Sequence, residues 1–595
     1  MARMIRQLDD EALEKPFNKQ QFFRLLQYLK PYKKKILSAL LLMLIAALCS
    51  LASPYLMSRA IGSLQNKELK YIPFLIAGMV VISLIGYFCT KYRIRWMDTS
   101  GKSALATLRE DLFHHIQGMS FSFFDTRSAG KLLVRVINDV NSLNELFTNG
   151  IVNVLIDCVT LVLLLVIMFC VNWKLTLIGL CIMPLLIFIL FKLKRVMRLR
   201  WQRVRVKSST MNGYLHESLT GMRVTKAFVR EDENADTFRH VNNDIRDNWM
   251  KAVTINNALW PALDMTGVLG TVLVYIFGVH FMQQDGLVLA DLLLLIWYLD
   301  RFWMPLNTLS NFYNSLLTAS ASMERIFEIM DTPSDIQDDE NAKPLPPIEG
   351  NVTFDHVTFS YDREKTVLKN VSFYIKAGKT VALVGPTGAG KTTIVNLLSR
   401  FYDPTEGKVL IDGHDIKKVQ LDTMRKQMSV MMQDSFIFSG TIMENIRYGR
   451  LDATDEEIRE AAKRVRADDF ISKMKEGYNT TVNERGGNLS QGQKQLVAFA
   501  RTLLSDPAIL ILDEATSSID TQTEKLLQEG INEMLKGRTS FIIAHRLSTI
   551  KNCDRILYIG NKGIMESGSH DELMAKKGLY YQLYTTQAQS QGHEL

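Results

Sequence analysis

Long apolar segments in the first half of the chain limit its fold more strongly than any other feature of the sequence. The hydrocarbon core of a membrane is about 30 Å thick, so a helix needs about 20 mostly apolar residues to cross it. Six stretches approach or exceed this length with few charges, and a tight turn is expected at residues 171–174, between the third and the fourth. We predict membrane-spanning helices at residues 36–56, 72–89, 151–170, 175–191, 255–282 and 292–317.

The charge of the chain differs between its two halves. The whole sequence has 70 Lys and Arg residues and 62 Asp and Glu residues, a net charge of +8. Residues 331–595 contain 33 basic and 37 acidic residues, which leaves 37 and 25 for residues 1–330. The first half is therefore strongly basic and the second weakly acidic. This composition excludes a disordered or low-complexity chain, and the six cysteines, most of them beside apolar runs, exclude a disulfide scaffold.

Basic residues are concentrated in one set of loops, and this predicts the orientation of the spans. Residues 192–207 contain eight Lys and Arg residues, whereas residues 283–291 contain none. Loops with an excess of basic residues face the cytoplasm, so we expect both termini there. Residues 1–35 show no pattern of a cleavable signal peptide. Within them, Phe and Leu alternate with Lys and Arg at residues 19–30, which predicts an amphipathic elbow helix on the inner membrane surface.

Four ionisable residues lie at the depth of the predicted spans, namely Asp157, Asp264, Asp300 and Arg301. Charges are costly in hydrocarbon and usually face the interior of a helix bundle or a wet cavity. We therefore regard Asp264 and the Asp300/Arg301 pair as candidates for a substrate cavity or a gate. Pairing between helices, or helices long enough to place these groups near the membrane edge, would explain the same residues structurally.

The sequence changes character after residue 330. Residues 331–350 combine an acidic run with four prolines and predict an exposed linker. In residues 351–585 short apolar strands alternate with amphipathic helices, the pattern of an α/β domain, and residues 586–595 form a tail. We expect an all-α domain of six transmembrane helices within residues 36–330, followed by this α/β domain.

A phosphate-binding loop lies near the start of the α/β domain, between an apolar strand at residues 380–384 and a helix at residues 393–398. Glycines let backbone N–H groups surround phosphate oxygens, the lysine reaches the outer phosphates, and the next threonine ligates Mg²⁺. The loop and the residue after it are Gly385, Pro386, Thr387, Gly388, Ala389, Gly390, Lys391, Thr392 and Thr393. The pattern predicts a P-loop NTPase fold.

Two carboxylates follow a second apolar strand. Residues 508–512 are apolar and are followed by Asp513 and Glu514. Ligands of α/β domains bind at the C-terminal edge of the sheet, which is where both side chains are expected. Asp513 suits the Mg²⁺ shell, and Glu514 suits a general base that activates water. The dipeptide alone is a weak signal, and the phosphate loop strengthens it.

Between these two motifs, residues 488–495 read NLSQGQKQ, and here the chain resembles the ATP-binding cassette (ABC) family. The resemblance covers both halves, with six spans and then one cassette, as in exporter half-transporters. It implies ATP and Mg²⁺ as cofactors, ATPase activity coupled to transport, and Glu514 as general base. It also assigns Tyr361 to adenine stacking, Gln433 to the Q-loop and Mg²⁺, Asp520 to the D-loop, and His545 to sensing the γ-phosphate.

The resemblance further implies a dimer. In the family, signature residues contact ATP on the opposite cassette, and closure of the two cassettes around ATP turns the pathway outward. The signature of this chain is Leu489, Ser490, Gln491, Gly492 and Gln493. The residues that resemble coupling segments between cassette and spans are Phe124, Asp125, Glu217, Gly221 and Glu484.

One residue departs from the family pattern. The usual signature is LSGGQ, and this chain has Gln491 in place of the first glycine, whereas its own base Glu514 is intact. This combination resembles the hydrolysis-competent subunit of heterodimeric bacterial multidrug exporters. We therefore predict a heterodimer whose active site uses Lys391 and Glu514 of this chain with the signature of a second half-transporter. A homodimer that tolerates Gln491 is the alternative.

The spans and the cassette do not identify the cargo. ATP-driven export of hydrophobic or amphipathic compounds, of the multidrug type, is our leading expectation. A lipid or lipid-linked glycan flippase, a peptide exporter, and an ATP-gated channel or regulator are the alternatives. Six spans exclude a soluble ABC ATPase that acts on nucleic acid, and importers usually encode spans and cassette on separate chains. We expect contact with membrane lipids and a location in a bacterial plasma membrane, with the cassette in the cytoplasm.

Overall fold

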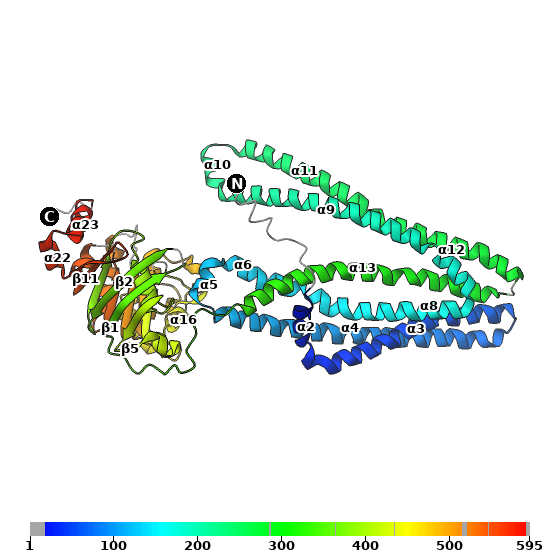
Figure 1. Cartoon of the computed structure of the whole chain (residues 1–595), viewed down its shortest axis with the longest axis horizontal. Coiled ribbons are helices and arrows are strands. Elements are labelled where there is room, and N and C mark those ends of the chain that lie inside the picture. Colours follow the sequence, from blue (N-terminus) through cyan, green and yellow to red (C-terminus); the bar gives the residue numbers. More distant parts are fainter. Residues whose placement is uncertain are drawn as a thin grey trace. The chain divides into compact units, whose positions relative to one another are not determined.

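A computed structural model of the chain describes residues 18–284, 287–362, 365–432, 435–513, 521–544 and 547–590. The chain forms two compact units. The first comprises Met1–Gln117 and Ala129–Thr332 and is helical, whereas the second comprises Gly118–Ser128 and Pro333–Leu595 and contains the sheets (Figure 1). The short segment Gly118–Ser128 therefore belongs to the second unit, although helices of the first unit flank it in the sequence.

Six long helices contain most residues of the predicted spans. They are α3 (Lys33–Gln65), α4 (Ile72–Gln117), α8 (Ile151–Leu180), α9 (Met183–Thr220), α12 (Leu259–Gln284) and α13 (Leu289–Asp331). Four described segments are long and apolar enough to cross a membrane, namely Lys30–Gln65, Leu69–Gln117, Asn153–Leu180 and Asp264–Gln283. The fourth predicted span lies across the junction of α8 and α9, and the sixth lies in α13. The first unit is thus a helical membrane domain.

The turn predicted at residues 171–174 is a break within α8. Asn172 leaves the helical conformation, with φ −159° and ψ 108°. Its side-chain oxygen accepts a hydrogen bond from the backbone N–H of Leu175 at 3.0 Å, and the Thr176 hydroxyl donates to the Asn172 carbonyl at 2.8 Å. Asparagine is a favoured helix N-cap because its side chain satisfies a free backbone N–H group. It therefore starts the helical segment that follows the break.

Several helices are longer than a bilayer requires. α4, α9 and α13 contain 46, 38 and 43 residues. At a rise of about 1.5 Å per residue, α4 would be about 69 Å long, more than twice the thickness of the hydrocarbon core. α9 lies beside α11 (Glu231–Asn257), and α10 (Met222–Ala227) connects them at the tip of this hairpin (Figure 1). Helices of this length exceed the thickness of the hydrocarbon core, so part of each lies outside it.

The amphipathic segment near the N-terminus forms helix α2 (Lys19–Gln27). Leu25 is fully buried, and Arg24 contacts the end of α13 through an ion pair with Asp331 at 2.5 Å and a position 4.5 Å from the centre of the Phe327 ring. Phe23, by contrast, is 64% exposed. One face of α2 therefore packs on protein, and apolar surface at Phe23 stays exposed. The location of α2 on the inner membrane surface stays a prediction.

Residues 333–350, within the segment predicted as an exposed linker, are exposed at most positions and make hydrogen bonds with the rest of the second unit. They form no helix, but Leu345 is 5% exposed. The backbone N–H groups of Leu345 and Ile348 donate to side chains of Thr423 and Gln427, both at 2.9 Å. Proline prevents a regular element, yet the extended backbone still offers N–H groups that cassette side chains accept. The segment is thus bound along the surface of the second unit.

The second unit contains two main sheets. The larger has the order β12-β11-β3-β10-β9-β6 and is parallel except for β12, and the smaller is antiparallel with the order β2-β1-β4-β5. The strands of the larger sheet are β3 (Thr380–Val384), β6 (Met428–Met431), β9 (Ile509–Asp513), β10 (Thr539–Ile543), β11 (Arg555–Gly560) and β12 (Gly563–Gly568). Those of the smaller sheet are β1 (Val352–Ser360), β2 (Thr366–Ile375), β4 (Glu406–Ile411) and β5 (His414–Asp415), and β7 (Gly440–Thr441) pairs with β8 (Thr481–Val482).

Helices cover these sheets, and the unit therefore has the predicted α/β fold. The principal helices are α5 (Phe121–Thr126), α14 (Lys391–Leu398), α15 (Leu421–Arg425), α16 (Ile442–Arg447), α17 (Asp455–Arg464), α19 (Gln491–Leu504), α20 (Thr521–Leu535), α22 (His570–Lys576) and α23 (Leu579–Ser590). The apolar residues of β3 and β9 are buried. Only β10 separates these two strands, so their C-terminal ends, before Gly385 and at Asp513, lie at the same edge of the sheet.

Candidate functional site

Three glycines shape the loop between β3 and α14. Gly385, Gly388 and Gly390 have φ angles of 138°, 80° and 103°, which other residues rarely adopt. A side chain at Gly385 would also place its Cβ 2.1 Å from the carbonyl oxygen of Ile559. Gly390 is the N-cap of α14, and no side chain caps the helix there. The first N–H groups of α14 can therefore bind an anion, as the sequence predicts.

Lys391 is held against the loop that precedes it. Its side chain is 8% exposed, and its ammonium group donates to the carbonyl oxygens of Gly385 and Pro386 at 2.8 and 2.9 Å. Burial lowers the pKa of Lys391 below its usual value, and the nearby carboxylate of Asp513 opposes this shift. The structure thus brings Lys391 and Asp513 together at the edge of the sheet. The Lys391 ammonium group therefore lies beside the phosphate-binding loop.

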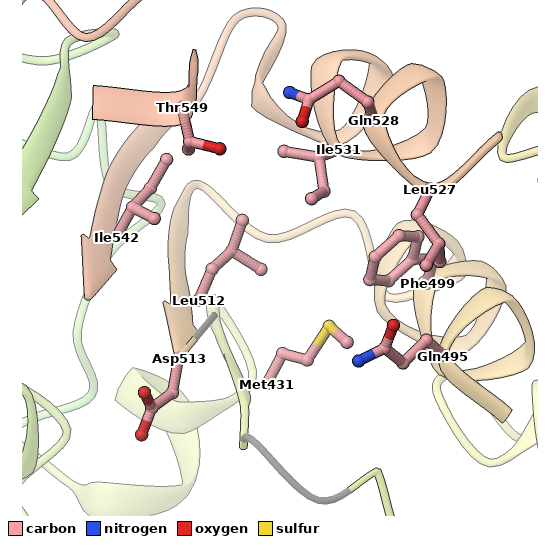
Figure 2. Close-up of a pocket in the computed structure, with 10 residues that line it drawn as sticks. All are labelled: Met431, Gln495, Phe499, Leu512, Asp513, Leu527, Gln528, Ile531, Ile542 and Thr549. Carbon is pink, nitrogen blue, oxygen red and sulfur yellow. The ribbon is translucent and has the colours of Figure 1, made fainter. Parts of the chain in front are cut away.

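Asp513 ends β9 beside a small apolar cavity of about 30 Å³. Figure 2 shows its carboxylate turned away from the cavity that Leu512 and Phe499 help to line. Alternation of side chains along a strand explains the two opposite directions. Asp513 and the exposed Thr392 suit Mg²⁺, which is usually held by one or two protein oxygens together with phosphate and water. No cluster of three His, Cys, Asp or Glu residues occurs in the described part of the chain.

Four predicted site residues lie outside the described residues. They are the general base Glu514, the Q-loop residue Gln433, the D-loop residue Asp520 and the γ-phosphate sensor His545. Their positions in the sequence still follow described elements, because β9 ends at Asp513 and β10 ends at Ile543. Their roles remain predictions.

Tyr361, the predicted adenine-stacking residue, lies against the P-loop helix. Its hydroxyl is 3.2 Å from both the Thr393 hydroxyl and the Asn396 amide nitrogen, which donates to it. The Tyr361 side chain is 48% exposed, and its ring meets Phe359 edge-to-face at 4.8 Å. An exposed aromatic face that is fixed at its edge can stack on a flat base.

The signature residues surround the N-terminus of α19. Ser490 is the N-cap, and its hydroxyl accepts from the N–H of Gln493 at 3.2 Å, while the Gln493 side chain accepts from the N–H of Ser490 at 2.9 Å. Leu489 and Gly492 are buried, whereas Ser490 and Gln491 are exposed. The buried pair anchors the helix start, and the exposed pair faces outward.

The predicted coupling residues lie on separate elements. Phe124 and Asp125 are in α5, Glu217 is near the C-terminal end of α9, Gly221 caps that end, and Glu484 begins the turn Glu484–Gly486. Within the second unit, the ring of Phe121 stacks on Phe401, with centroids 4.2 Å apart. The Tyr402 hydroxyl donates to Asp125. Sequence reasoning missed Phe121, Phe401 and Tyr402, and the available signal was an aromatic pair directly after the P-loop helix.

Neighbouring helices engage several charged residues at span depth. Arg301 donates to the backbone carbonyl of Ser50 on α3, which favours a structural role. Asp157 accepts a hydrogen bond from Thr308 and lies near Arg93, which sequence reasoning did not select. Asp264 and Asp300 are exposed in the isolated chain.

Known proteins resemble both units. The ABC transporter transmembrane region family matches residues 36–306, and the ABC transporter family matches residues 368–517. The Bacillus subtilis (strain 168) protein YknV, named an uncharacterized ABC transporter ATP-binding protein, is 45% identical over 97% of this chain and 96% of its own length. An ATP-dependent lipid A-core flippase of Syntrophus aciditrophicus (strain SB) is 35% identical over 95% of this chain and 94% of its own length.

Two further matches concern exporters. A Staphylococcus aureus (strain NCTC 8325 / PS 47) protein, provisionally named a multidrug export ATP-binding/permease protein, is 37% identical over 95% of this chain and 99% of its own length. A bacterial Atm1-family ABC exporter with ATP bound has a similar structure, with a TM-score of 0.77 and 30% sequence identity over 93% of this chain and 98% of that chain.

Proposed function

The chain belongs to the ABC transporter family as an exporter half-transporter, and we propose that it is the hydrolysing subunit of a multidrug-type exporter. Its ATPase domain is coupled to transport, and half-transporters of this kind dimerise. The proposed cargo is a hydrophobic or amphipathic compound moved outward across a bacterial plasma membrane. The observation that carries the proposal is the fusion of a helical membrane domain with a cassette in which Lys391 of the P-loop lies near Asp513 at the end of β9.

The residues of the ATP site have separate proposed tasks. The glycine loop and the N-terminus of α14 bind the phosphates, and Lys391 turns from the loop carbonyls toward the outer phosphate oxygens. Thr392, Asp513 and Gln433 hold Mg²⁺, which supplies charge neutralisation at the phosphates when bound. Glu514 activates the attacking water and His545 contacts the γ-phosphate. Tyr361 binds the adenine by stacking.

The dimer proposal has support from two surfaces that suit each other. The tip of the α9–α11 hairpin exposes apolar side chains at α10 and just after it, where Phe228 is 73% and Val229 is 80% exposed. A groove of about 760 Å³ in the second unit is lined by residues that include Phe436, Leu451 and Arg501. Exposed apolar patches of this kind mark interaction sites. We place α10 of the partner chain in this groove. In the sequence, α10 directly follows the coupling residues Glu217 and Gly221.

Gln491 supports a heterodimer with one fully active site. It is exposed at the first turn of α19, where the family pattern has a glycine that permits close approach of backbone to nucleotide. A glutamine side chain there adds bulk toward the partner's ATP. The active site would then combine Lys391 and Glu514 of this chain with the signature of the partner. The membrane orientation, with the cassette and both termini in the cytoplasm, follows from the basic loops.

The dimer proposal is tested with the full chain expressed alone. We expect weak ATPase activity from the wild-type homodimer and a gain of at least about tenfold in Gln491→Gly, since each chain would then supply a complete signature. Gln491→Met, which keeps a side chain of similar bulk at the same position, is the matched control and should show no such gain. Robust ATPase activity of the wild-type chain alone, abolished by Glu514→Gln, would refute the heterodimer.

The cargo proposal is tested on the reconstituted transporter. ATPase stimulation and uphill transport are measured with a panel of drugs, lipids and peptides, with Glu514→Gln as the inactive control. Stimulation by several unrelated hydrophobic drugs is expected. The match to a lipid A-core flippase favours a lipid flippase as the second candidate, and a response to one lipid class with no response to drugs would establish it instead. Downhill leak opened by ATP would indicate a channel.

A further inference from the structure

The loop that follows the P-loop helix has a fixed backbone. Arg400 is 2% exposed and adopts a left-handed φ of 48°. Its guanidinium donates to two backbone carbonyl oxygens, each at 3.1 Å, and its own carbonyl accepts from Arg425 at 2.9 Å. A buried side chain with several hydrogen bonds has little freedom to move. Phe401 and Tyr402, the next two residues, therefore extend from a rigid support at the C-terminal end of α14.

On one side, these two aromatic residues contact α5. The Phe401 ring stacks on Phe121 with centroids 4.2 Å apart and an angle of 28° between the rings. The Tyr402 hydroxyl donates a hydrogen bond to the Asp125 carboxylate. A tyrosine hydroxyl is protonated at neutral pH and can act as the donor, and burial and this hydrogen bond raise the pKa of Tyr402 further. A hydrogen bond to a charged group is about twice as strong as one between neutral groups.

On the other side, Tyr402 contacts the proposed base-binding residue. Its ring meets Tyr361 edge-to-face, with centroids 4.9 Å apart and an angle of 86°. Phe359 completes the group, at 4.8 Å from Tyr361 and 5.7 Å from Tyr402. Edge-to-face pairs are favoured at ring separations of about 4.5–7 Å. The Tyr361 and Tyr402 rings are near the short end of this range, so a displacement of the Tyr361 ring toward Tyr402 favours an adjustment of the Tyr402 ring.

We propose that Tyr402 is a positioning residue that links occupancy of the base seat at Tyr361 to the orientation of α5. The inference rests on the proposed function, in which Tyr361 stacks on adenine and α5 couples the cassette to the spans. Because the Tyr402 backbone is fixed, its side chain responds to the base by rotation, and its hydroxyl carries that rotation to Asp125. Linkage also works in reverse, so loss of the Asp125 contact must change the affinity for the base.

Hydrogen–deuterium exchange of the full-length transporter tests this link. The Glu514→Gln background keeps the nucleotide intact, and exchange at residues 119–128 is compared with ATP and with inorganic tripolyphosphate, which has no base. We expect ATP to slow exchange in this segment about tenfold more than tripolyphosphate does. In Tyr402→Phe, which keeps the ring and removes the hydroxyl, this difference should fall below about twofold. A purely structural role would not distinguish the two ligands.

Two further variants complete the experiment. Asp125→Ala removes the hydrogen-bond acceptor on the exposed side of α5 and replaces Tyr402→Phe if that variant does not fold. It should abolish the difference in exchange between ATP and tripolyphosphate. Tyr374→Phe is the matched control. The Tyr374 hydroxyl donates to the Asn351 side chain, just before β1, at 3.1 Å, so its removal should leave the response as in the wild type. An ATP-specific response that persists in Tyr402→Phe and Asp125→Ala overturns the inference, as does an equal response to tripolyphosphate. If ATP does not slow exchange in α14, the proposed function itself fails.

Discussion

Replacement of Asp139 by Asn should destabilise the membrane unit. Asp139 is 5% exposed and lies in the π-helical turn Arg135–Asp139, between α6 (Ala129–Val134) and α7 (Val140–Ser142). Its carboxylate accepts hydrogen bonds from Arg325 at 2.5 and 3.0 Å, from Arg135 at 3.0 Å and from Ser322 at 3.1 Å. Arg325 and Ser322 belong to α13, so this one carboxylate fastens two distant segments of the chain.

The size of the effect follows from burial. Removal of one partner from a buried ion pair costs about 3–5 kcal/mol, because the remaining charge stays desolvated. Here the side chains of Arg325 and Arg135 are 29% and 22% exposed, so water reduces the loss. We therefore expect Asp139→Asn to cost about 2–3 kcal/mol, since the amide keeps the shape and a hydrogen bond to Ser322.

The assay is unfolding of the purified full-length protein in detergent, followed by heat and by denaturant. Asp98→Asn is the control, because Asp98 pairs with Lys102 at 2.8 Å on an exposed helix surface, with side chains 41% and 65% exposed. Such pairs contribute about 0–1 kcal/mol. Equal stability of Asp139→Asn and Asp98→Asn would refute the reasoning, because burial would then make no difference to the ion pair.

Three further predictions concern pH, phosphate binding and the glycine loop. Burial alone would raise the pKa of Asp139, but the two arginines hold it below its usual value. The stabilisation by Asp139 is therefore present above about pH 4 and is lost as the pH falls further. Between pH 7 and pH 3, the free energy of unfolding should decline less steeply in Asp139→Asn than in the wild type. Lys391→Met should weaken ATP binding about 10- to 100-fold in a titration with a fluorescent ATP analogue, and unchanged affinity would contradict its role. Gly385→Ala should lower the free energy of unfolding of the cassette by more than about 2 kcal/mol, because its Cβ would lie 2.1 Å from the Ile559 carbonyl oxygen. A Cβ at Gly388 would meet no atom within 4 Å, so Gly388→Ala should lower it less.

Local patterns predicted the elements of the nucleotide site well. The strand expected at residues 380–384 is β3, and the helix expected after the loop is α14, which begins two residues earlier at Lys391. Both follow from interactions between neighbouring residues. A short apolar run forms a buried strand, and the glycine loop is followed by a helix whose first N–H groups have no partner within the helix. The break at Asn172 is likewise local, because its own side chain caps the helix that follows.

Contacts between distant residues could not be predicted in the same way. Tyr402 and Asp125 are 277 positions apart, and Arg325 and Asp139 are 186 apart. Neither pair has a spacing that a helix or strand would impose. The composition of residues 331–350 excludes a regular element, but it does not show which distant side chains, such as Thr423, accept the N–H groups of this segment.

The sequence by itself determined that this chain enters a membrane and binds a nucleotide. Apolar length and the glycine–lysine loop act through solvation and backbone geometry, which are properties of neighbouring residues. Only the tertiary structure decided which distant residues lie together. It assigned segment 118–128 to the cassette unit and brought Tyr402 between Tyr361 and Asp125. Such connections depend on the path of the folded chain, because hydrogen bonds and ring contacts act over a few ångströms regardless of sequence separation.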